Sequence, residues 1–157
     1  MQVTLRPFSL PLVRPLSTSS ARIDRRDGVL VVVDADGERG VGEATPLSGW
    51  TEGLPACTKA LERARDSLGS VDADDVERTL ATLVTTPAAR HGLHLALADL
   101  AARQAGRPLY RHLGGEDAVE SVAANATFGD GEVAETVGAA RRAVEAGFSC
   151  LKVKVGA

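Results

Sequence analysis

Two lysines near the end of the chain have the type and spacing that proton transfer requires. Lys152 and Lys154 are two of the three lysines in 157 residues, and they lie two positions apart. The side-chain period of a β-strand is two, so both ammonium groups project from one face and disfavour each other's charged form. A lysine that accepts a proton needs such a setting. The alternative is an exposed edge strand, on which lysines only deter pairing with other strands.

Composition limits the classes of function. The chain is 44% hydrophobic and 25% charged, which is typical of one soluble globular domain or of a small domain with part of another. Aromatic residues make up 3%, so the core must be built from Leu, Val and Ala, and stacking platforms for single-stranded nucleic acid are missing. A net charge of −3 disfavours a nucleic-acid partner or an anionic membrane as partner.

The two cysteines and the pattern of apolar residues bear on the cellular compartment of the protein. Cys57 and Cys150 are too few and too far apart for a disulfide framework or a zinc site, and they suit a reducing environment. The N-terminus has no apolar signal core, and no run approaches the ~20 apolar residues of a membrane span. We therefore expect a cytoplasmic protein with no membrane partner.

Residues 2–45 predict an antiparallel meander of three strands. Residues 2–10 alternate loosely, 29–33 form a β-branched apolar run, and the turn signal at 34–37 precedes a third strand at 39–44. Prolines interrupt the first strand region, which favours an edge strand that leads into a loop over residues 16–20; these prolines are Pro7, Pro11 and Pro15.

Residues 51–113 change to a helical period. A first helix follows Pro55, with an apolar stripe of Cys57, Leu61, Ala64 and Leu68. A short helix is expected over 74–83, begun by an acidic cluster of Asp72, Asp74 and Asp75. A third helix should begin with Thr86 as its cap and Pro87 at its first position, and run to Gln104. Strands followed by segregated helices indicate an α+β domain.

Residues 119–157 predict one βαβ unit. A strand is expected over 119–126, a helix over 132–145 and a second strand over 149–155, with the two strands parallel. The helix has an apolar stripe of Val133, Val137, Ala140 and Val144. Because parallel sheets are buried on both faces, the apolar surface of this unit requires further strands and helices.

This order of parts resembles a known family. An α+β region, then the run from Ala98-Asp99-Leu100 through Gly106-Arg107-Pro108-Leu109 to Leu113-Gly114-Gly115, then a β/α start that ends in Lys-x-Lys, is similar to the muconate-lactonising branch of the enolase superfamily. The resemblance implies an α+β capping domain over residues 1–117, a three-stranded antiparallel meander plus helices. The first β/α units of a truncated TIM-type barrel follow over residues 118–157.

The resemblance also implies roles for the lysines. Lys154 matches the acid/base lysine of the family motif, and Lys152 matches the lysine beside it, which helps to keep Lys154 neutral. Both belong near the carboxyl end of barrel strand two, where TIM-barrel sites are built. The family uses Mg²⁺ (or Mn²⁺) to hold the charge of an ene-diolate. Its metal carboxylates and second lysine come from later strands, so we expect an N-terminal fragment without metal ligands, inactive alone.

Within the branch, the cap motifs most resemble the o-succinylbenzoate synthase family. These motifs are the Leu16–Ser20 loop after Arg14-Pro15, the Arg26-Asp27-Gly28 stretch and residues 42–50, and Asn125 on the first barrel strand adds to the likeness. The resemblance implies a lyase that dehydrates 2-succinyl-6-hydroxy-2,4-cyclohexadiene-1-carboxylate to 2-succinylbenzoate in menaquinone biosynthesis. N-succinylamino-acid racemases, dipeptide epimerases and muconate cycloisomerases share much of the pattern. A non-catalytic, truncated cap domain that serves as a binding module is the alternative from another class.

The resemblance implies a small-molecule carboxylate as substrate. It also allows the full-length protein to form a homo-oligomer. Candidate substrate-binding residues lie in two cap loops and on the first barrel strand: Ser17, Thr18, Leu47, Ser48, Gly49, Trp50 and Asn125. Three structural alternatives stay open. The 16–20 segment suits a plain surface loop, Trp50 suits an anchor for the following helix, and Asn125 suits a hydrogen bond at a strand end.

Three other polar residues are interpreted as structural. His91 and His94 have the helical spacing of a metal pair, but no third ligand accompanies them, so histidines facing solvent or the core are favoured. Glu43 is assigned to the third strand of the cap.

Overall fold

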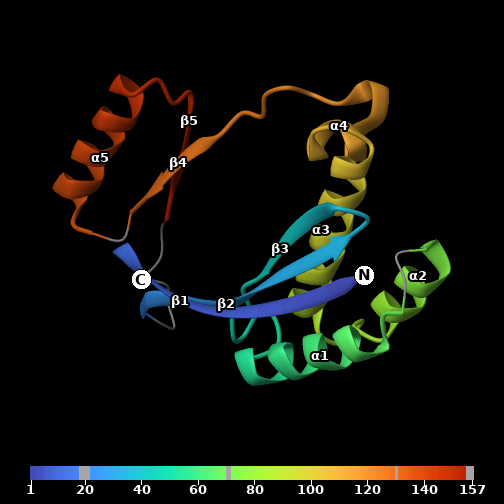
Figure 1. Cartoon of the computed structure of the whole chain (residues 1–157). Helices are drawn as coiled ribbons and strands as arrows, with labels where there is room; N and C mark the ends of the chain where they lie inside the picture. The colour runs from blue at the N-terminus through green and yellow to red at the C-terminus, as the bar shows by residue number, and fades with distance from the viewer. Residues whose placement is uncertain (18–21, 70–71, 130, 155–157) are drawn as a thin grey trace. The chain divides into compact units, whose positions relative to one another are not determined.

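The computed structural model describes residues 1–17, 22–69, 72–129 and 131–154, and Figure 1 shows the course of the chain. The chain divides into two compact units. The first contains Met1–Pro11 and Arg25–Val119, and the second contains Leu12–Asp24 and Glu120–Ala157. The expected domain boundary after residue 117 stays a prediction.

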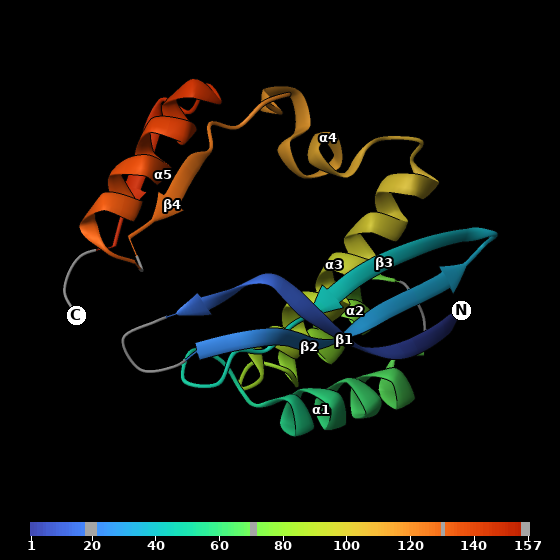
Figure 2. The same ribbon diagram turned by 90° about the vertical axis from the view of Figure 1, so that its left-hand side faces the viewer.

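The first unit is built on a three-stranded sheet. The strands of this sheet are β1 (Gln2–Ser17), β2 (Arg22–Ala35) and β3 (Glu38–Ala44), in the order β1-β2-β3 (Figure 2). The end of β1 from Leu12 and the start of β2 up to Asp24 belong to the second unit. β2 and β3 pair antiparallel from Val29 opposite Ala44 to Ala35 opposite Glu38. Asp36 and Gly37 join them with φ of 53° and 82°, the left-handed pair that a tight hairpin turn needs. The predicted hairpin is confirmed.

β1 is longer than its sequence pattern predicts. It continues through all three prolines to Ser17, because β1 lies at an edge of the sheet, where a residue without an N–H is tolerated. Leu16 and Ser17 therefore end a strand and do not open a loop. Residues 18–20 of the expected loop lie outside the described residues.

Four helices and a 3₁₀ turn follow the sheet: α1 (Leu54–Ser67), α2 (Ala73–Ala81), α3 (Pro87–Gln104), α4 (Leu109–Gly114) and η1 (Gly115–Asp117). The first three confirm the periodicity of the sequence, while α4 and η1 were not predicted. The Asp72 carboxylate accepts the Asp75 N–H at 3.0 Å, so the acidic cluster does begin α2. None of the described helices has the length and apolar character needed to cross a membrane.

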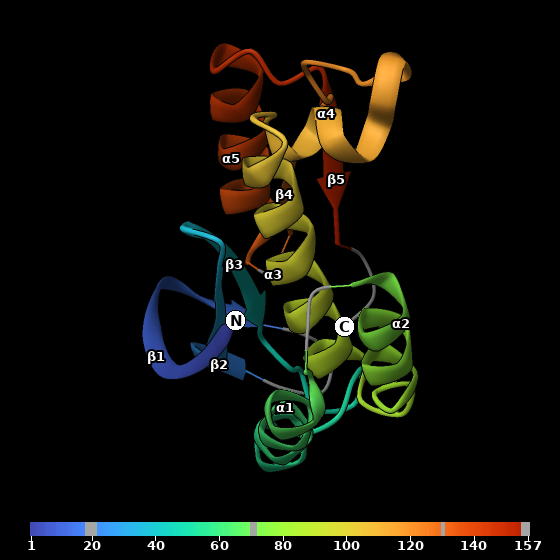
Figure 3. The same ribbon diagram turned by 45° about the vertical axis from the view of Figure 1, so that its right-hand side comes forward.

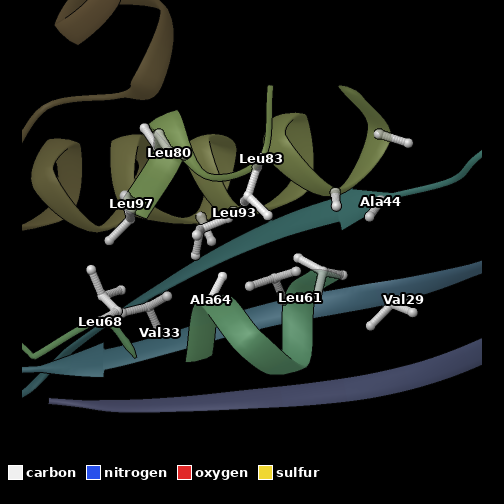
Figure 4. Packing of buried hydrophobic residues seen from close by; sticks show 14 of the residues in the cluster. Val29, Val33, Ala44, Leu61, Ala64, Leu68, Leu80, Leu83, Leu93 and Leu97 are labelled. Atoms are coloured by element: carbon white, nitrogen blue, oxygen red, sulfur yellow. The ribbon is translucent and has the colours of Figure 1, made fainter. Parts of the chain in front are cut away.

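The core of the first unit lies between the sheet and the helices. Valines of β2 face leucines and alanines of α1, α2 and α3, and the close view in Figure 4 shows them pointing toward one another. The largest fully buried side chains are aliphatic or sulfur-containing: Leu61, Leu93, Leu100, Val29, Val31, Val33 and Cys57. This agrees with a core that is built almost without aromatic residues.

The backbone of β3 is in direct contact with the backbone of α3. A Cβ on Gly40 would come within 2.0 Å of the Ala96 carbonyl oxygen, and a Cβ on Gly42 within 2.0 Å of the Gly92 carbonyl oxygen. Only glycine permits such an approach. The Asp99 carboxylate on α3 also accepts the Val41 N–H at 3.0 Å, so the helix satisfies a donor on β3.

The second unit contains a short parallel strand pair and one helix, seen from another side in Figure 3. β4 (Asn125–Phe128) pairs with β5 (Cys150–Val153), and α5 (Val133–Glu145) connects them. The parallel βαβ unit is confirmed. The first strand was predicted over 119–126 but begins at Asn125, because β5 offers partners only to residues 125–128. Val155, predicted to end the second strand, lies outside the described residues.

The apolar stripe of α5 is largely exposed. Val133 is 78% exposed and Val144 is 60% exposed, and of the helix's residues only Ala143 is buried. This agrees with the expectation that one βαβ unit cannot cover its own apolar surface. The helix begins with a capping box, in which Glu132 and Glu135 satisfy each other's backbone donors.

Substituting Gly42 tests the contact between β3 and α3. We expect Gly42→Ala to lower the free energy of unfolding by about 2–3 kcal/mol, because the added methyl group forces the strand off the helix. Urea unfolding measures this loss. Gly53→Ala is the control, since its Cβ would meet no atom closer than 3.9 Å; we expect a loss below about 1 kcal/mol there. Equal losses in both variants would contradict the contact's importance.

The two cysteines should differ in reactivity. Burial raises the pKa of Cys57 to about 12, with a further contribution from the Glu52 carboxylate, whereas Cys150 is exposed. We expect a thiol reagent at neutral pH to label Cys150 in the folded protein and Cys57 only after unfolding. Labelling of both at one rate would contradict this.

The raised pKa of Cys57 also predicts a pH dependence of stability. The folded state holds this proton more tightly, so its contribution is complete below the ordinary thiol pKa of about 8.5 and is lost as pH rises toward 12. We expect the stability difference between wild type and Cys57→Ala to shrink by up to about 1 kcal/mol per pH unit above pH 9. Urea unfolding at pH 8 and 10.5 measures it, with Cys150→Ala as the control that keeps the slope.

Candidate functional site

The two lysines lie at the carboxyl end of the parallel strand pair. Lys152 is an exposed residue of β5 and pairs with Thr127 of β4. Lys154 follows the last residue of β5 and is half-buried, and its N–H donates to the Phe128 carbonyl oxygen at 2.8 Å. In α/β folds ligands bind at the carboxyl ends of parallel strands. The position of Lys154 is therefore one at which a proton-transfer group can work.

A hollow of about 340 Å³ lies beside the end of β4 in the same unit. Thr127, Phe128 and Gly129 line it from the strand, and Glu135 and Arg142 line it from α5. Leu16, from the end of β1, also lines this hollow. Thr18 lies outside the described residues, and so does the side chain of Ser17, so their assignment to substrate binding stays a prediction.

Asn125 lies at the other end of β4. It is the first residue of the strand, pairs with Cys150, and donates its side-chain N–H to the Thr127 hydroxyl at 2.9 Å. This bond supports the structural alternative for Asn125. A direct contact of Asn125 with substrate stays a prediction.

The cap loop after β3 is closed by hydrogen bonds. The N–H groups of Trp50 and Thr51 both donate to the Leu47 carbonyl oxygen at 2.9 Å, and the Leu47 N–H donates to the Thr51 hydroxyl at 2.8 Å. Gly49 turns the loop with a φ of 90°. The loop over residues 47–51 is therefore an ordered structure, and it presents Ser48, Gly49 and Trp50 to solvent.

Trp50 does not anchor the following helix. Its side chain is 86% exposed, whereas α1 is held to the core by Cys57, Leu61 and Ala64. An exposed tryptophan on an ordered loop is free to contact a ligand. The anchor interpretation is wrong, and the ligand interpretation stays a prediction.

Glu52, which no pattern in the sequence indicated, fixes the far end of the cap loop. Its carboxylate accepts the N–H of Ala88 at 3.2 Å and of Ala89 at 2.9 Å, so it caps the first turn of α3. Thr86 was predicted to do this, but its hydroxyl donates to the Leu83 carbonyl oxygen. Because 36 residues separate Glu52 from the helix it caps, no local sequence signal could reveal it.

The histidines form no metal centre. His91 and His94 are both exposed, and His91 lines an open hollow of about 440 Å³ with Glu43, Thr45 and Thr51. Glu43 accepts a hydrogen bond from the Thr45 hydroxyl, which agrees with its structural interpretation. Throughout the described ranges, no three His, Cys, Asp or Glu side chains form a group that fits a metal ion.

Comparison with known proteins decides the family. Residues 1–100 match the family described as MenC, N-terminal domain. The L-Lys-D/L-Arg epimerase of Methylococcus capsulatus is 37% identical over 163 residues, covering 98% of this chain and 44% of that protein. The chain belongs to the enolase superfamily. Within this superfamily its relatives fall in the branch of mandelate racemase and muconate-lactonising enzymes.

Solved structures of the enolase superfamily share the fold. The dipeptide epimerase from Enterococcus faecalis V583, complexed with Mg and L-Leu-L-Tyr, has a TM-score of 0.89 at 27% identity over 99% of this chain and 45% of its own. The dipeptide epimerase from Methylococcus capsulatus, complexed with Mg and L-Arg-D-Lys, has a TM-score of 0.83 at 36% identity over 98% and 45%. The chain spans less than half the length of the curated relatives it matches.

Thr51 should control the order of the cap loop. We expect Thr51→Val to loosen the loop, because it removes the hydroxyl that accepts the Leu47 N–H, while Thr51→Ser keeps that acceptor. Trp50 is the only tryptophan in the chain, so its fluorescence anisotropy reports on this loop alone. The anisotropy should fall in the valine variant and stay at the wild-type value in the serine variant. Equal values in both variants would show that the hydroxyl does not order the loop.

Proposed function

We propose that the chain belongs to a dipeptide epimerase and carries one of its two acid/base groups, Lys154. The observation that supports this most is the place of Lys154 at the carboxyl end of a parallel strand pair, in a fold shared with epimerases solved with Mg and a dipeptide. This function is the alternative that the sequence analysis left open beside the lyase activity.

The reaction explains why a lysine is needed. Epimerisation removes the proton from a Cα next to a carboxylate and returns a proton to the opposite face of the same carbon. The neutral Nζ of Lys154 accepts the proton from one face, and the electron pair of the C–H bond moves into the carboxylate as an ene-diolate. A second group must donate a proton from the other face. We assign that group to the part of the relatives that this chain does not span.

Other residues of the chain have supporting roles. Lys152 stands two residues from Lys154 and adds positive charge where the ene-diolate forms. The loop over residues 47–51 offers Trp50 as an apolar contact for a substrate side chain. The described residues contain no ligand set for a divalent cation, and the proposal gives none of them that role.

Cationic dipeptides are the first substrates to test. Two relatives, at 37% and 32% identity, are L-Lys-D/L-Arg epimerases from Methylococcus capsulatus and Desulforapulum autotrophicum. Others act on hydrophobic or aromatic dipeptides, such as those from Citrifermentans bemidjiense and Herpetosiphon aurantiacus. One assay can therefore compare turnover of cationic, hydrophobic and aromatic dipeptides directly.

Dehydration of the succinyl cyclohexadiene carboxylate is the second candidate. It is supported by the cap motifs over residues 14–50 and by the family match over residues 1–100. Both reactions begin with removal of a proton beside a carboxylate, so both are consistent with Lys154. The named relatives are epimerases, and for this reason we place the lyase second.

A substrate panel tests the proposal. The longest protein that the gene encodes is incubated in D₂O with Mg²⁺ and L-Lys-L-Arg, L-Ala-L-Glu, L-Leu-L-Tyr or the cyclohexadiene. We expect deuterium at the Cα of a dipeptide and appearance of its diastereomer. Lys154→Ala should reduce turnover by at least ~10³-fold, because it removes a proton-transfer group. Lys59→Ala is the matched control, since this lysine lies on α1 in the other unit, and it should keep full activity.

Two outcomes would overturn the proposal. Turnover of the cyclohexadiene without any epimerisation would establish the lyase. Epimerisation that survives Lys154→Ala would remove the lysine from the reaction.

A further inference from the structure

Gly129 combines a positive φ with a close contact to the backbone of Lys154. Its φ is 110°, and a Cβ at this position would lie 2.6 Å from the Lys154 carbonyl oxygen and 2.8 Å from the Lys154 nitrogen. It would also lie 3.2 Å from Val153 Cγ1. The backbone after β4 therefore touches the backbone after β5 at the lysine that we assign to proton transfer.

The other glycines with positive φ differ from Gly129. A Cβ on any of them would meet no heavy atom within 4 Å; these are Gly37, Gly49, Gly106, Gly115 and Gly147. Each of those glycines serves a turn or a helix end, where only the backbone angle matters. Among the described residues, Gly129 combines the left-handed angle with a close backbone contact. The contact partner is Lys154 itself.

A hydrogen bond fixes the same place from the neighbouring residue. The Phe128 carbonyl oxygen accepts the Lys154 N–H at 2.8 Å, and this bond extends the parallel pairing of Phe128 with Val153 by one step. Phe128 thus holds the Lys154 backbone by a hydrogen bond. Gly129 has no side chain, and the Lys154 backbone occupies the space that a Cβ would fill. Neither residue needs to touch a substrate to do this.

We propose that Gly129 is a positioning residue for Lys154: its missing side chain sets where the lysine backbone leaves β5. The proposal rests on the proposed function of Lys154. Alanine at residue 129 would have to lie at least 0.4 Å farther from the Lys154 carbonyl oxygen, the gap between 2.6 Å and the 3.0 Å that real Cβ contacts keep, so the two backbone segments must move apart. A misplacement of about 1 Å at a reacting group costs roughly 100-fold in rate, and the flexible lysine side chain recovers part of it.

Gly147 offers a matched control. It lies in the same unit, has a φ of 91°, and a Cβ there would meet nothing within 4 Å. Gly129→Ala and Gly147→Ala therefore both place alanine at a positive φ, but only the first adds a methyl group against Lys154. Any effect of strain alone appears in both variants.

The first measurement uses the 157-residue chain and no substrate. Hydrogen exchange of the Lys154 amide, followed by NMR, reports on its bond to Phe128. We expect Gly129→Ala to speed this exchange by at least tenfold and Gly147→Ala to change it less than twofold. If the two variants behave alike, Gly129 does not position Lys154, whatever the protein catalyses.

The second measurement uses the longest protein that the gene encodes. Deuterium uptake at Cα is followed separately from each diastereomer of the dipeptide, since Lys154 serves one face of the carbon. Gly129→Ala should slow uptake from one diastereomer by at least tenfold, change KM less than threefold, and leave uptake from the other diastereomer within twofold. Equal slowing from both diastereomers would indicate a general structural defect and overturn the proposal.

Lys154→Ala in the same assay separates the two proposals. If this variant keeps exchange from both diastereomers, the function proposed for Lys154 fails, and the amide exchange alone decides the role of Gly129. If Lys154→Ala abolishes exchange from one diastereomer while Gly129→Ala matches Gly147→Ala, the function stands and the positioning role is wrong.

Discussion

The backbone of β3 rests directly on the backbone of α3, and the first unit depends on this contact. Glycines at residues 40 and 42 remove the side chains that would hold a strand and a helix apart, and the carbonyl groups of Gly92 and Ala96 fill that space. With β3 held there, the valines of β2 reach the leucines of α1 and α3, and the hairpin ends where the cap loop begins. The loop that bears Trp50 thus begins at a strand held on α3 and ends at Glu52, which also bonds to α3.

Close approach made possible by glycine recurs in the second unit, at a smaller scale. There Gly129 lets two chain segments meet just beyond the paired strands, and the residue brought into place is Lys154. Both units use a glycine to bring two backbone segments into contact, but the contact has a different role in each. In the first unit, glycines let a strand pack closely on a helix over several residues. In the second unit, one glycine determines where the backbone of Lys154 leaves its strand.

Local patterns predicted the elements of the fold well. The stripe of α1, the proline that begins α3 and the turn between β2 and β3 are each decided by neighbouring residues, so periodicity and turn chemistry reveal them. The start of β4 depends on how far β5 extends, and the cap of α3 comes from Glu52, so neither is readable locally. For the site, spacing and the order of parts indicated Lys154, but the contact of Gly129 with it requires coordinates.

The two edges of the three-stranded sheet are closed in different ways. Prolines of β1 remove donors along one edge, and α3 covers β3 at the other, where Asp99 takes the Val41 N–H. Pairing of another strand with either edge of this sheet is therefore disfavoured. This favours contacts between the first unit and a neighbouring molecule that are made by side chains. One surface substitution can abolish such an interface, whereas a main-chain ladder would tolerate most substitutions.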